Sequence, residues 1–429
     1  MRFLFVHQNF PGQYRHLAAH YARRGHEVVA AGENANLART LRIPGVRLLG
    51  YDAPAVKPGV EAPVARAIQR GRRVAAGAMH LRRSGFQPDV IFAHIGWGEA
   101  LFLKDIFPEA RVILYCEFFY RSRGADLGFD PEFPATPEKR LNVRVMNAPL
   151  LMALDACDLG VTPTHWQHHQ FPQAHKPRIA VIHEGIDTEL VRPRPSDGEE
   201  LVTYVARNLE PYRGFHNFMR ALPEIQRRRP NARIVIVGGD EVSYSPRLPA
   251  GQTYRQRMLA ELDGRIDLSR VQFLGRIPYA HYLALLRRSA VHVYLTYPFV
   301  LSWSLLEAMS AGCLVVASRT APVEEVMRDG ENGLLVDFFS PAAIAERVAY
   351  ALEHQADLRP LREKARQIVV TRYDLKRVCL PAQLRLVDSL QRQGADARAA
   401  ADVKHLPGDE SGVAVGEEHH RARDVVGLA

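Results

Sequence analysis

Short apolar runs, rich in β-branched residues, alternate with segments of helical character along most of this chain. The runs before residue 187 are 2–6, 27–32, 46–51, 89–95, 111–119, 159–164 and 178–186. The runs after an interval at 191–200 are 201–207, 233–240, 271–277, 291–298, 313–318 and 332–337. Continuous apolar strands between helices are typical of a parallel sheet covered on both faces. Two such series predict an α/β fold of two doubly wound, Rossmann-like domains that face each other across a cleft.

The interval at 191–200 also predicts the domain boundaries. We expect an N-terminal domain over 1–186, a linker over 187–200 and a C-terminal domain over 201–375. A further helix over 376–393 is followed by no strand and is expected to pack back across the domains. Residues 394–429, rich in Ala, Gly and charge with almost no aromatic residue, are expected to be disordered.

Two helices stand out by their composition. The first, over 12–25, is closed by Gly25 before the next strand. The second, over 66–83, is strongly basic. A solvated helix face explains these charges, and a basic surface for an anionic membrane or a lipid phosphate is the alternative.

Composition and charge narrow the class of protein. With 429 residues, 47% hydrophobic and 24% charged, the chain has the profile of a soluble globular protein of two domains. No apolar run approaches the roughly 18 residues that span a bilayer, so the cytoplasm is the expected compartment. Four cysteines, far apart and without a CxxC pair, are expected to be buried small hydrophobic residues.

The net charge of +9 is compatible with nucleic acid, an anionic membrane surface or phosphorylated small molecules. No recognised nucleic-acid module is present, so no nucleic-acid partner is expected. The first strand runs into HQNFPGQYRHL without a G-x-G-x-x-G motif, which disfavours a dinucleotide-dependent oxidoreductase.

Polar residues suited to phosphate follow three strands of the second series. Arg207 and Arg213 come after the first strand, where two guanidinium groups can converge on a phosphate or can be two surface arginines on a turn. After the strand 313–318, the backbone amides of Ala321 and Val323 are candidates to cradle phosphate or sugar oxygens. Because the carboxyl ends of parallel strands share one edge, these loops are expected to form one site.

The third loop carries Glu307 in YPFVLSWSLLEAMSAG, residues 297–312. Ser304 and Glu307 have the S-x-x-E spacing of a capping box, which would give the glutamate a local role. A carboxylate in the first turn of a helix can also accept hydrogen bonds from a ribose diol. Gly312 is expected to end this helix.

Segment 297–337 resembles the donor-binding signature of family 4 (group 1) retaining glycosyltransferases, which have the two-domain GT-B fold. Residues 12–28 are similar to the family's first helix and second strand. The resemblance implies that Glu307 binds the ribose of a nucleotide sugar and that Arg207 and Arg213 bind its diphosphate. The base would lie near residues 275–278.

The resemblance implies the following site. The catalytic candidates are Arg207, Arg213, Glu307 and His94. The donor-binding candidates are Gly12, Arg276, Ile277, Phe299, Ser302, Ser304, Leu305, Leu306, Thr320, Ala321, Val323 and Glu325. The acceptor-binding candidates are His16, Glu117 and Tyr120. His94, at the end of a strand, can equally be a histidine satisfied by backbone groups.

Two positions depart from the family pattern. Phe299 stands where a first, sugar-contacting glutamate is usual, and Ala321-Pro322 replaces the usual Gly-Gly, although Glu325 matches the glutamate that follows. The resemblance implies a metal-independent, cofactor-free retaining enzyme that transfers a sugar to a glycan, lipid-linked or small-molecule acceptor. The alternative is a catalytically silent scaffold or regulatory protein that binds nucleotide sugars.

Overall fold

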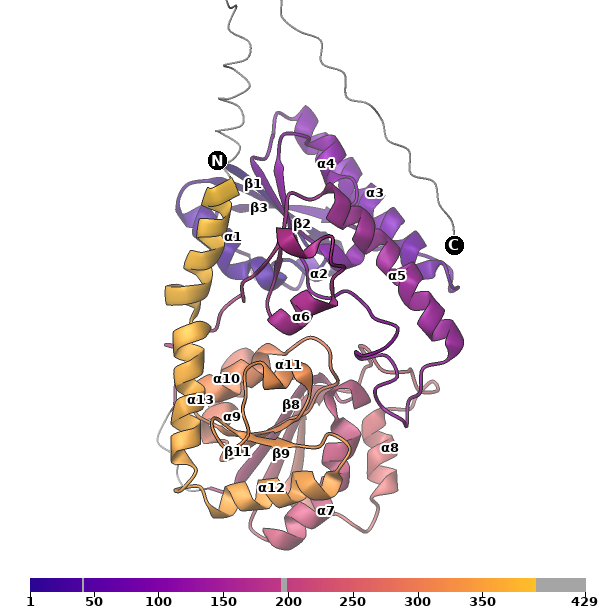
Figure 1. The fold of residues 1–429 in the computed structure, drawn as a ribbon. Helices are drawn as coiled ribbons and strands as arrows, with labels where there is room; N and C mark the ends of the chain where they lie inside the picture. The colour runs from indigo at the N-terminus through magenta and orange to yellow at the C-terminus, as the bar shows by residue number, and fades with distance from the viewer. Residues whose placement is uncertain (41, 194–198, 391–429) are drawn as a thin grey trace, which may run out of the picture. The chain divides into compact units, whose positions relative to one another are not determined.

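The structure is a computed structural model that describes residues 1–40, 42–193 and 199–390. One compact unit, Met1–Leu384, contains two parallel sheets (Figure 1), and a second unit starts at Arg385. Part of the predicted linker, the end of the helix predicted over 376–393 and the tail predicted as disordered over 394–429 lie outside the described residues. In the described part of the chain, no helix has the length and hydropathy needed to cross a membrane.

The first sheet has seven strands in the order β3-β2-β1-β4-β5-β6-β7. Its strands are β1 Arg2–Val6, β2 Glu27–Glu33, β3 Val46–Tyr51, β4 Val90–His94, β5 Arg111–Tyr115, β6 Leu159–Thr162 and β7 Ile179–Val181. The helices of this half are α1 Arg15–Arg23, α2 Asn34–Leu37, α3 Ala62–Arg83, α4 Leu103–Ile106, α5 Pro137–Ala156 and α6 His165–Gln170, with short 3-10 turns at Gly12–Tyr14, Ile95–Trp97 and Lys176–Arg178.

The second sheet has six strands in the order β10-β9-β8-β11-β12-β13. Its strands are β8 Leu201–Asn208, β9 Arg233–Gly239, β10 Val271–Gly275, β11 Val291–Tyr294, β12 Leu314–Ser318 and β13 Leu334–Val336. The helices are α7 Phe215–Arg228, α8 Tyr254–Glu261, α9 Tyr279–Arg288, α10 Trp303–Ala311, α11 Ala321–Glu324, α12 Pro341–Glu353 and α13 Arg359–Arg372, with 3-10 turns at Pro211–Arg213 and Leu268–Arg270 and a π-helical turn at Leu375–Cys379.

Every strand pairing in both sheets is parallel. Each predicted apolar run contains one of these strands. Alternate side chains of each strand point to opposite faces, and helices cover both. On the second sheet, α7 and α12 bury one face and α9, α10 and α13 bury the other (Figure 1). The prediction of two doubly wound, Rossmann-like domains is confirmed.

The strand order reverses beside β1 in the first sheet and beside β8 in the second. At such switch points the connections leave in opposite directions, which opens a crevice at the carboxyl ends of the strands. His94 ends β4, and Arg207 lies at the end of β8. The topology therefore brings several predicted site residues to these two edges.

Two predictions about individual side chains were tested by the fold. All four cysteines are buried and free, as expected. Arg70 on the basic helix is not part of a solvated face, because its guanidinium is buried, 2.8 Å from the carboxylate of Glu33, and also donates to the carbonyl of Trp97.

The chain returns from the second sheet to the end of the first. The backbone of Asp374 forms an isolated parallel β-bridge with that of Ile186, and the hydroxyl of Thr188 donates a hydrogen bond to the Asp374 carboxylate. Residues 380–390 are helical, and the Gln383 amide donates to the carbonyl of His183 at 3.1 Å. The domain boundaries themselves stay a prediction.

Candidate active site

A cavity of about 170 Å³ lies at the carboxyl ends of strands from both sheets. Five of the residues singled out from the sequence line it: Arg207, Arg213, Glu117, Ser302 and Ser304. They come from the ends of β5 and β8 and from the start of α10. The fold thus brings together two guanidinium groups, a carboxylate and two hydroxyls.

Arg213 is held in place by acceptors from β11 and from the loop that follows it. One guanidinium nitrogen donates to Thr296 Oγ1 at 2.7 Å, to the Val300 carbonyl at 3.1 Å and to the Tyr294 hydroxyl at 3.3 Å. The next residue, Gly214, has a φ of 67° and is the N-cap of α7. The Arg207 side chain has no hydrogen-bond or ion-pair partner among the described residues, so its guanidinium is available to a ligand, in a cavity that Glu117, Glu184 and Glu210 also line.

Glu117 faces these arginines from the other sheet. Its Oε2 lies 3.5 Å from His94 Nε2, and its Oε1 accepts a hydrogen bond from Gln13 at 3.4 Å. Burial alone would raise the pKa of Glu117, but the hydrogen bond to His94 and the charges of His94, Arg207 and Arg213 outweigh it and lower the pKa below its ordinary value. The carboxylate is therefore ionised at neutral pH.

His94 lies behind Glu117 and is only 1% exposed. Its Nδ1 accepts the backbone N–H of Gly96 at 3.0 Å, so the ring N–H is assigned to Nε2, which faces Glu117. Both readings of this histidine thus have support, because one ring nitrogen is satisfied by backbone and the other faces a cavity residue.

Behind His94 lies a second histidine that the sequence reasoning missed. The ring of His7 is 5.0 Å from that of His94, and burial, with a smaller contribution from His94, holds the pKa of His7 well below its ordinary value. Gly12 has a φ of 44°, and a Cβ atom there would lie 3.0 Å from the His7 ring. The three polar residues that follow the first strand, residues 7–9, were the sequence signal that could have identified His7 as a site residue. Gly12 therefore shapes the site by leaving room for His7.

The capping box, one of the two alternatives for Glu307, is wrong. The helix α10 begins at Trp303, and its N-cap is Ser302, whose hydroxyl accepts the Ser304 N–H at 3.3 Å. Glu307 is therefore one turn further along and accepts no bond from the start of the helix. Gly312, with a φ of 82°, ends the helix as predicted.

Glu307 instead accepts hydrogen bonds from two tyrosines at the start of α9. Its Oε1 accepts the Tyr279 hydroxyl at 2.6 Å, and its Oε2 accepts the Tyr282 hydroxyl at 2.8 Å. Burial raises the pKa of Glu307, and the two hydrogen bonds partly oppose this. The tyrosine hydroxyls occupy both carboxylate oxygens, as a pair of ribose hydroxyls would. Sequence reasoning missed this pair, although the i, i+3 spacing places both on one helix face.

Several donor candidates have side chains that cannot reach a ligand. Leu305, Leu306 and Val323 are fully buried in the core between the sheet and α9, α10 and α13. The backbone amide of Val323 is also engaged, since it donates to the Thr320 carbonyl at 2.8 Å. These residues belong to the frame of the site.

Glu325 lies on the N-terminus of α6. Its two carboxylate oxygens accept the backbone N–H groups of His165 at 2.8 Å and Trp166 at 2.7 Å. The free amides of a helix's first turn favour a carboxylate. Both oxygens of Glu325, a donor-binding candidate, are thus engaged by α6, and this contact links the two halves of the unit.

Phe299 is 4% exposed and packs among aromatic rings of both halves. Its ring centroid lies 4.7 Å from Phe118, 5.0 Å from Tyr244 and 5.6 Å from Tyr212. Tyr120 packs against the same cluster. The position where a sugar-contacting glutamate was expected is thus an apolar contact.

The remaining candidates lie outside the cavity wall. Arg276 is half exposed and binds Asn208 at 3.0 Å and Glu241 at 2.6 Å. Ile277 packs partly into the core. His16 is exposed on α1, and partial burial and the charge of Arg15 lower its pKa.

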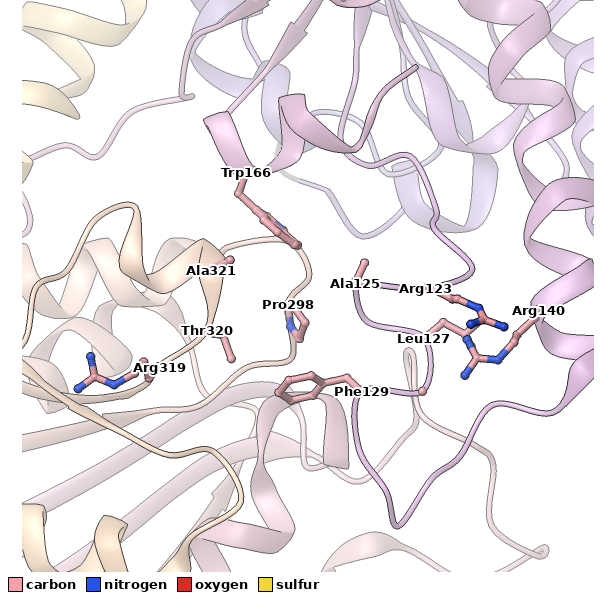
Figure 2. A pocket seen from close by; sticks show the side chains of 12 residues that line it. Arg123, Ala125, Leu127, Phe129, Arg140, Trp166, Pro298, Arg319, Thr320 and Ala321 are labelled. Atoms are coloured by element: carbon pink, nitrogen blue, oxygen red, sulfur yellow. The ribbon is translucent and has the colours of Figure 1, made fainter. Parts of the chain in front are cut away.

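A larger cavity, of about 620 Å³, contains the last two donor candidates, Thr320 and Ala321 (Figure 2). It is also lined by Pro298, while Val300 lines the smaller cavity. Phe299 and its aromatic neighbours thus lie where the two cavities approach each other. Among the described residues, no His, Cys, Asp and Glu side chains gather in a group of three or more that could hold a metal ion.

The fold, two parallel sheets each flanked by helices, is that of the GT-B class. The structure of Anabaena Alr3699/HepE in complex with UDP and glucose matches with a TM-score of 0.66 and 19% identity, over 91% of this chain and 100% of that one. Sucrose-phosphate synthase from Thermosynechococcus elongatus matches with a TM-score of 0.66 and 18% identity, over 92% and 100% of the two chains.

Two family models match consecutive parts of the chain. "Glycosyl transferase family 4 group" matches residues 24–191, and "Glycosyl transferases group 1" matches residues 187–368. The chain belongs to this family of glycosyltransferases, as the sequence resemblance indicated.

Curated relatives are similar over part of their length. D-inositol 3-phosphate glycosyltransferase of Corynebacterium efficiens is 26% identical over 63% of this chain and 65% of the relative. Phosphatidyl-myo-inositol mannosyltransferase of Mycobacterium tuberculosis is 29% identical over 47% of this chain and 50% of the relative. The chain thus spans between half and two thirds of these relatives.

Proposed function

We propose that this protein is a retaining glycosyltransferase that moves a sugar from a nucleoside-diphosphate sugar to a glycan, lipid-linked or small-molecule acceptor. The observation that carries the proposal is the cavity in which Arg207 and Arg213 meet the ionised Glu117 at the switch points of both sheets. The relative solved with UDP and glucose supports UDP-glucose as the first donor to test.

The proposed chemistry depends on charge stabilisation. Departure of the nucleoside diphosphate from C1 of the sugar leaves an oxocarbenium-like centre and places negative charge on the leaving phosphate. Arg207 and Arg213 would stabilise this charge, and because their guanidinium groups are permanently charged, the step needs no metal ion. Arg213 is already held by three acceptors, so little reorganisation accompanies the reaction.

Glu307 is proposed to bind the ribose. A ribose diol would replace the hydroxyls of Tyr279 and Tyr282 on the carboxylate, and the half-exposed Tyr279 would then be free to move toward the nucleotide. Retention of configuration would follow from attack on the face that the leaving group vacates, assisted by its own phosphate oxygen. No cofactor beyond the donor is required.

One observation favours a second function, a nucleotide-sugar-binding scaffold without turnover. Phe299 replaces a polar sugar contact by a buried ring among Phe118, Tyr212 and Tyr244. A protein of this kind would bind the nucleotide through the arginines but would hold the sugar poorly.

Donor binding and turnover separate the two functions. A thermal-shift screen of uridine, guanosine and adenosine diphosphate sugars is expected to raise the unfolding temperature with at least one donor, because a ligand of the native state stabilises it. Hydrolysis or transfer of that donor, lost in Arg207→Ala and kept in Arg72→Ala on the exposed face of α3, supports the enzyme. Tight binding without turnover supports the scaffold, and no shift with any donor contradicts both.

A further inference from the structure

The larger cavity is rich in positive charge. The residues that line its 620 Å³ include three arginines, Arg123, Arg140 and Arg319, and no carboxylate. This volume lies within the range of small-molecule sites in proteins. The cavity is therefore large enough for a ligand, and its charge limits the chemistry of that ligand.

Arg319 is already neutralised by its neighbours. Its guanidinium lies 2.9 Å from Asp329 and 3.8 Å from Glu324. Figure 2 shows it extending away from the other two arginines. The charge available to a ligand is therefore that of Arg123 and Arg140.

Arg123 and Arg140 lie together at one end of the cavity (Figure 2). Arg123 has no hydrogen-bond or ion-pair partner among the described residues. Arg140 donates to the carbonyl of Ser122 and lies against Gly128, where a Cβ atom would be 2.9 Å from its guanidinium. The Ser122 carbonyl brings no compensating charge, so two like charges remain unneutralised.

Carboxylates close in sequence do not compensate these charges. Four carboxylates lie between Arg123 and Arg140, and none of them lines the cavity. Asp126 accepts the Tyr212 hydroxyl at 2.6 Å, Asp130 accepts the Tyr297 hydroxyl at 2.7 Å, Glu132 pairs with the Arg220 guanidinium, and Glu138 is exposed. The fold thus turns the acidic side chains of this segment away from the cavity.

A second, independent feature also calls for an acceptor. The indole Nε1 of Trp166, another residue that lines the cavity, is buried without a hydrogen-bond partner. Buried donors in native structures are normally satisfied by protein, water or ligand. The cavity therefore offers two guanidinium groups and one indole N–H to a ligand rich in acceptor oxygens.

We propose that this cavity binds a phosphorylated acceptor, with the phosphate monoester of a small sugar or polyol between Arg123 and Arg140. A phosphate accepts bidentate hydrogen bonds from guanidinium groups and neutralises both charges. The Trp166 N–H would bind a ligand oxygen, and the far end of the ligand would lie at Pro298, on the side of the donor cavity. The inference rests on the proposed function, because it assigns the acceptor class of the same transferase.

Isothermal titration calorimetry on the full chain tests the proposal. Glucose 6-phosphate, glucose, glucuronate and inorganic phosphate serve as probes at low salt. Glucose 6-phosphate is expected to bind at least tenfold more tightly than glucose or glucuronate, because only the phosphate carries a second negative charge. Its affinity is expected to fall as salt concentration rises.

Substitution locates the site. Arg123→Gln and Arg140→Gln are each expected to weaken glucose 6-phosphate binding by about 10- to 100-fold, the range of charge-assisted hydrogen bonds. Arg140→Lys keeps the charge and loses the bidentate geometry. Its affinity for glucose 6-phosphate is expected to lie between those of the wild type and Arg140→Gln. Arg72→Gln, an exposed arginine on α3, is the matched control and is expected to bind as the wild type does. Far-ultraviolet circular dichroism checks that each variant is folded.

Three results would overturn the proposal. One is equal binding of glucose 6-phosphate and glucose, and another is wild-type binding in both glutamine variants. Equal affinity for inorganic phosphate and glucose 6-phosphate would refute the acceptor assignment, because the sugar would then contribute nothing. UDP-glucose binding, titrated in parallel, tests the proposed function separately, so a failure of one is distinguishable from a failure of the other.

Discussion

The two cavities differ in how the protein compensates their arginines. In the smaller one, Arg213 is held by three acceptors and the ionised Glu117 lies opposite. In the larger one, Arg123 and Arg140 have no carboxylate partner, because none of the acidic side chains of their segment lines the cavity. A guanidinium group that is fixed in position can stabilise negative charge that develops during a reaction. Two guanidinium groups without a carboxylate partner instead favour binding of a ligand that is already anionic.

Arginine substitution at the smaller cavity should give the largest effect. Arg213→Ala is expected to lower kcat by about 100- to 1000-fold, since it removes a preorganised donor to the leaving phosphate. Steady-state kinetics with the donor found by thermal shift measure this change. If Arg213→Ala kept kcat within twofold of wild type, the role of the smaller cavity in the reaction would be refuted.

The aromatic cluster between the cavities can be removed at Phe299. Phe299→Ala is expected to lower the free energy of unfolding by about 3–5 kcal/mol, because a buried ring with three aromatic neighbours is lost. Urea denaturation measures the change. Leu141→Ala, at a residue 73% exposed, is the control and is expected to stay within about 0.5 kcal/mol of wild type. A loss as small as the control's would show that the cluster is not packed as described.

The contact of Glu325 with α6 is a weaker link between the halves. Glu325→Ala is expected to lower the free energy of unfolding by about 1 kcal/mol, as for the loss of a helix N-cap. Glu325→Gln keeps one oxygen that can accept a hydrogen bond, so its free energy of unfolding is expected to fall by less than that of Glu325→Ala. If Ala and Gln variants unfolded at the same denaturant concentration as wild type, the carboxylate would not cap α6 in solution.

The smallest expected effect is on the pH dependence of stability. The pKa of Glu117 is lowered, because His94, Arg207 and Arg213 outweigh the effect of burial, so its stabilising contribution is lost as pH falls below about 4.5. The pKa of Glu307 is raised by burial, so its contribution is present below about pH 4.5 and is lost as pH rises through its folded-state pKa.

The two corresponding glutamine variants should therefore change the pH profile in opposite senses. Glu117→Gln is expected to lose less stability than wild type on acidification, and Glu307→Gln is expected to lose less on a rise in pH. Thermal unfolding between about pH 3 and pH 7 measures both profiles. Profiles parallel to that of the wild type in both variants would contradict the described environments of these carboxylates.

The sequence predicted the strands better than the contacts of individual side chains. Each apolar run became a strand of the expected sheet, because a strand buried on both faces leaves a continuous apolar pattern. The sequence also predicted that Arg207, Arg213 and Glu117 follow the ends of strands, and in the structure all three line one cavity. These successes depend on local patterns and on the common edge of a parallel sheet.

The contacts that the sequence did not predict are those between residues distant in the chain. Glu307 has the spacing of a capping box, yet its partners are Tyr279 and Tyr282 on another helix. Glu325 matches a family position, yet it binds α6 in the other half. Spacing along the chain cannot show which of several acceptors a carboxylate meets.

The sequence by itself thus determined two parallel sheets, their order along the chain, the family and the strand ends that carry arginines. Only the tertiary structure decided that Phe299 packs in an apolar cluster, that Glu307 binds two tyrosines, and that Arg123 and Arg140 stand uncompensated in a second cavity. The physical reason is that periodic burial is written in neighbouring residues, whereas charge compensation depends on side chains that meet only after folding.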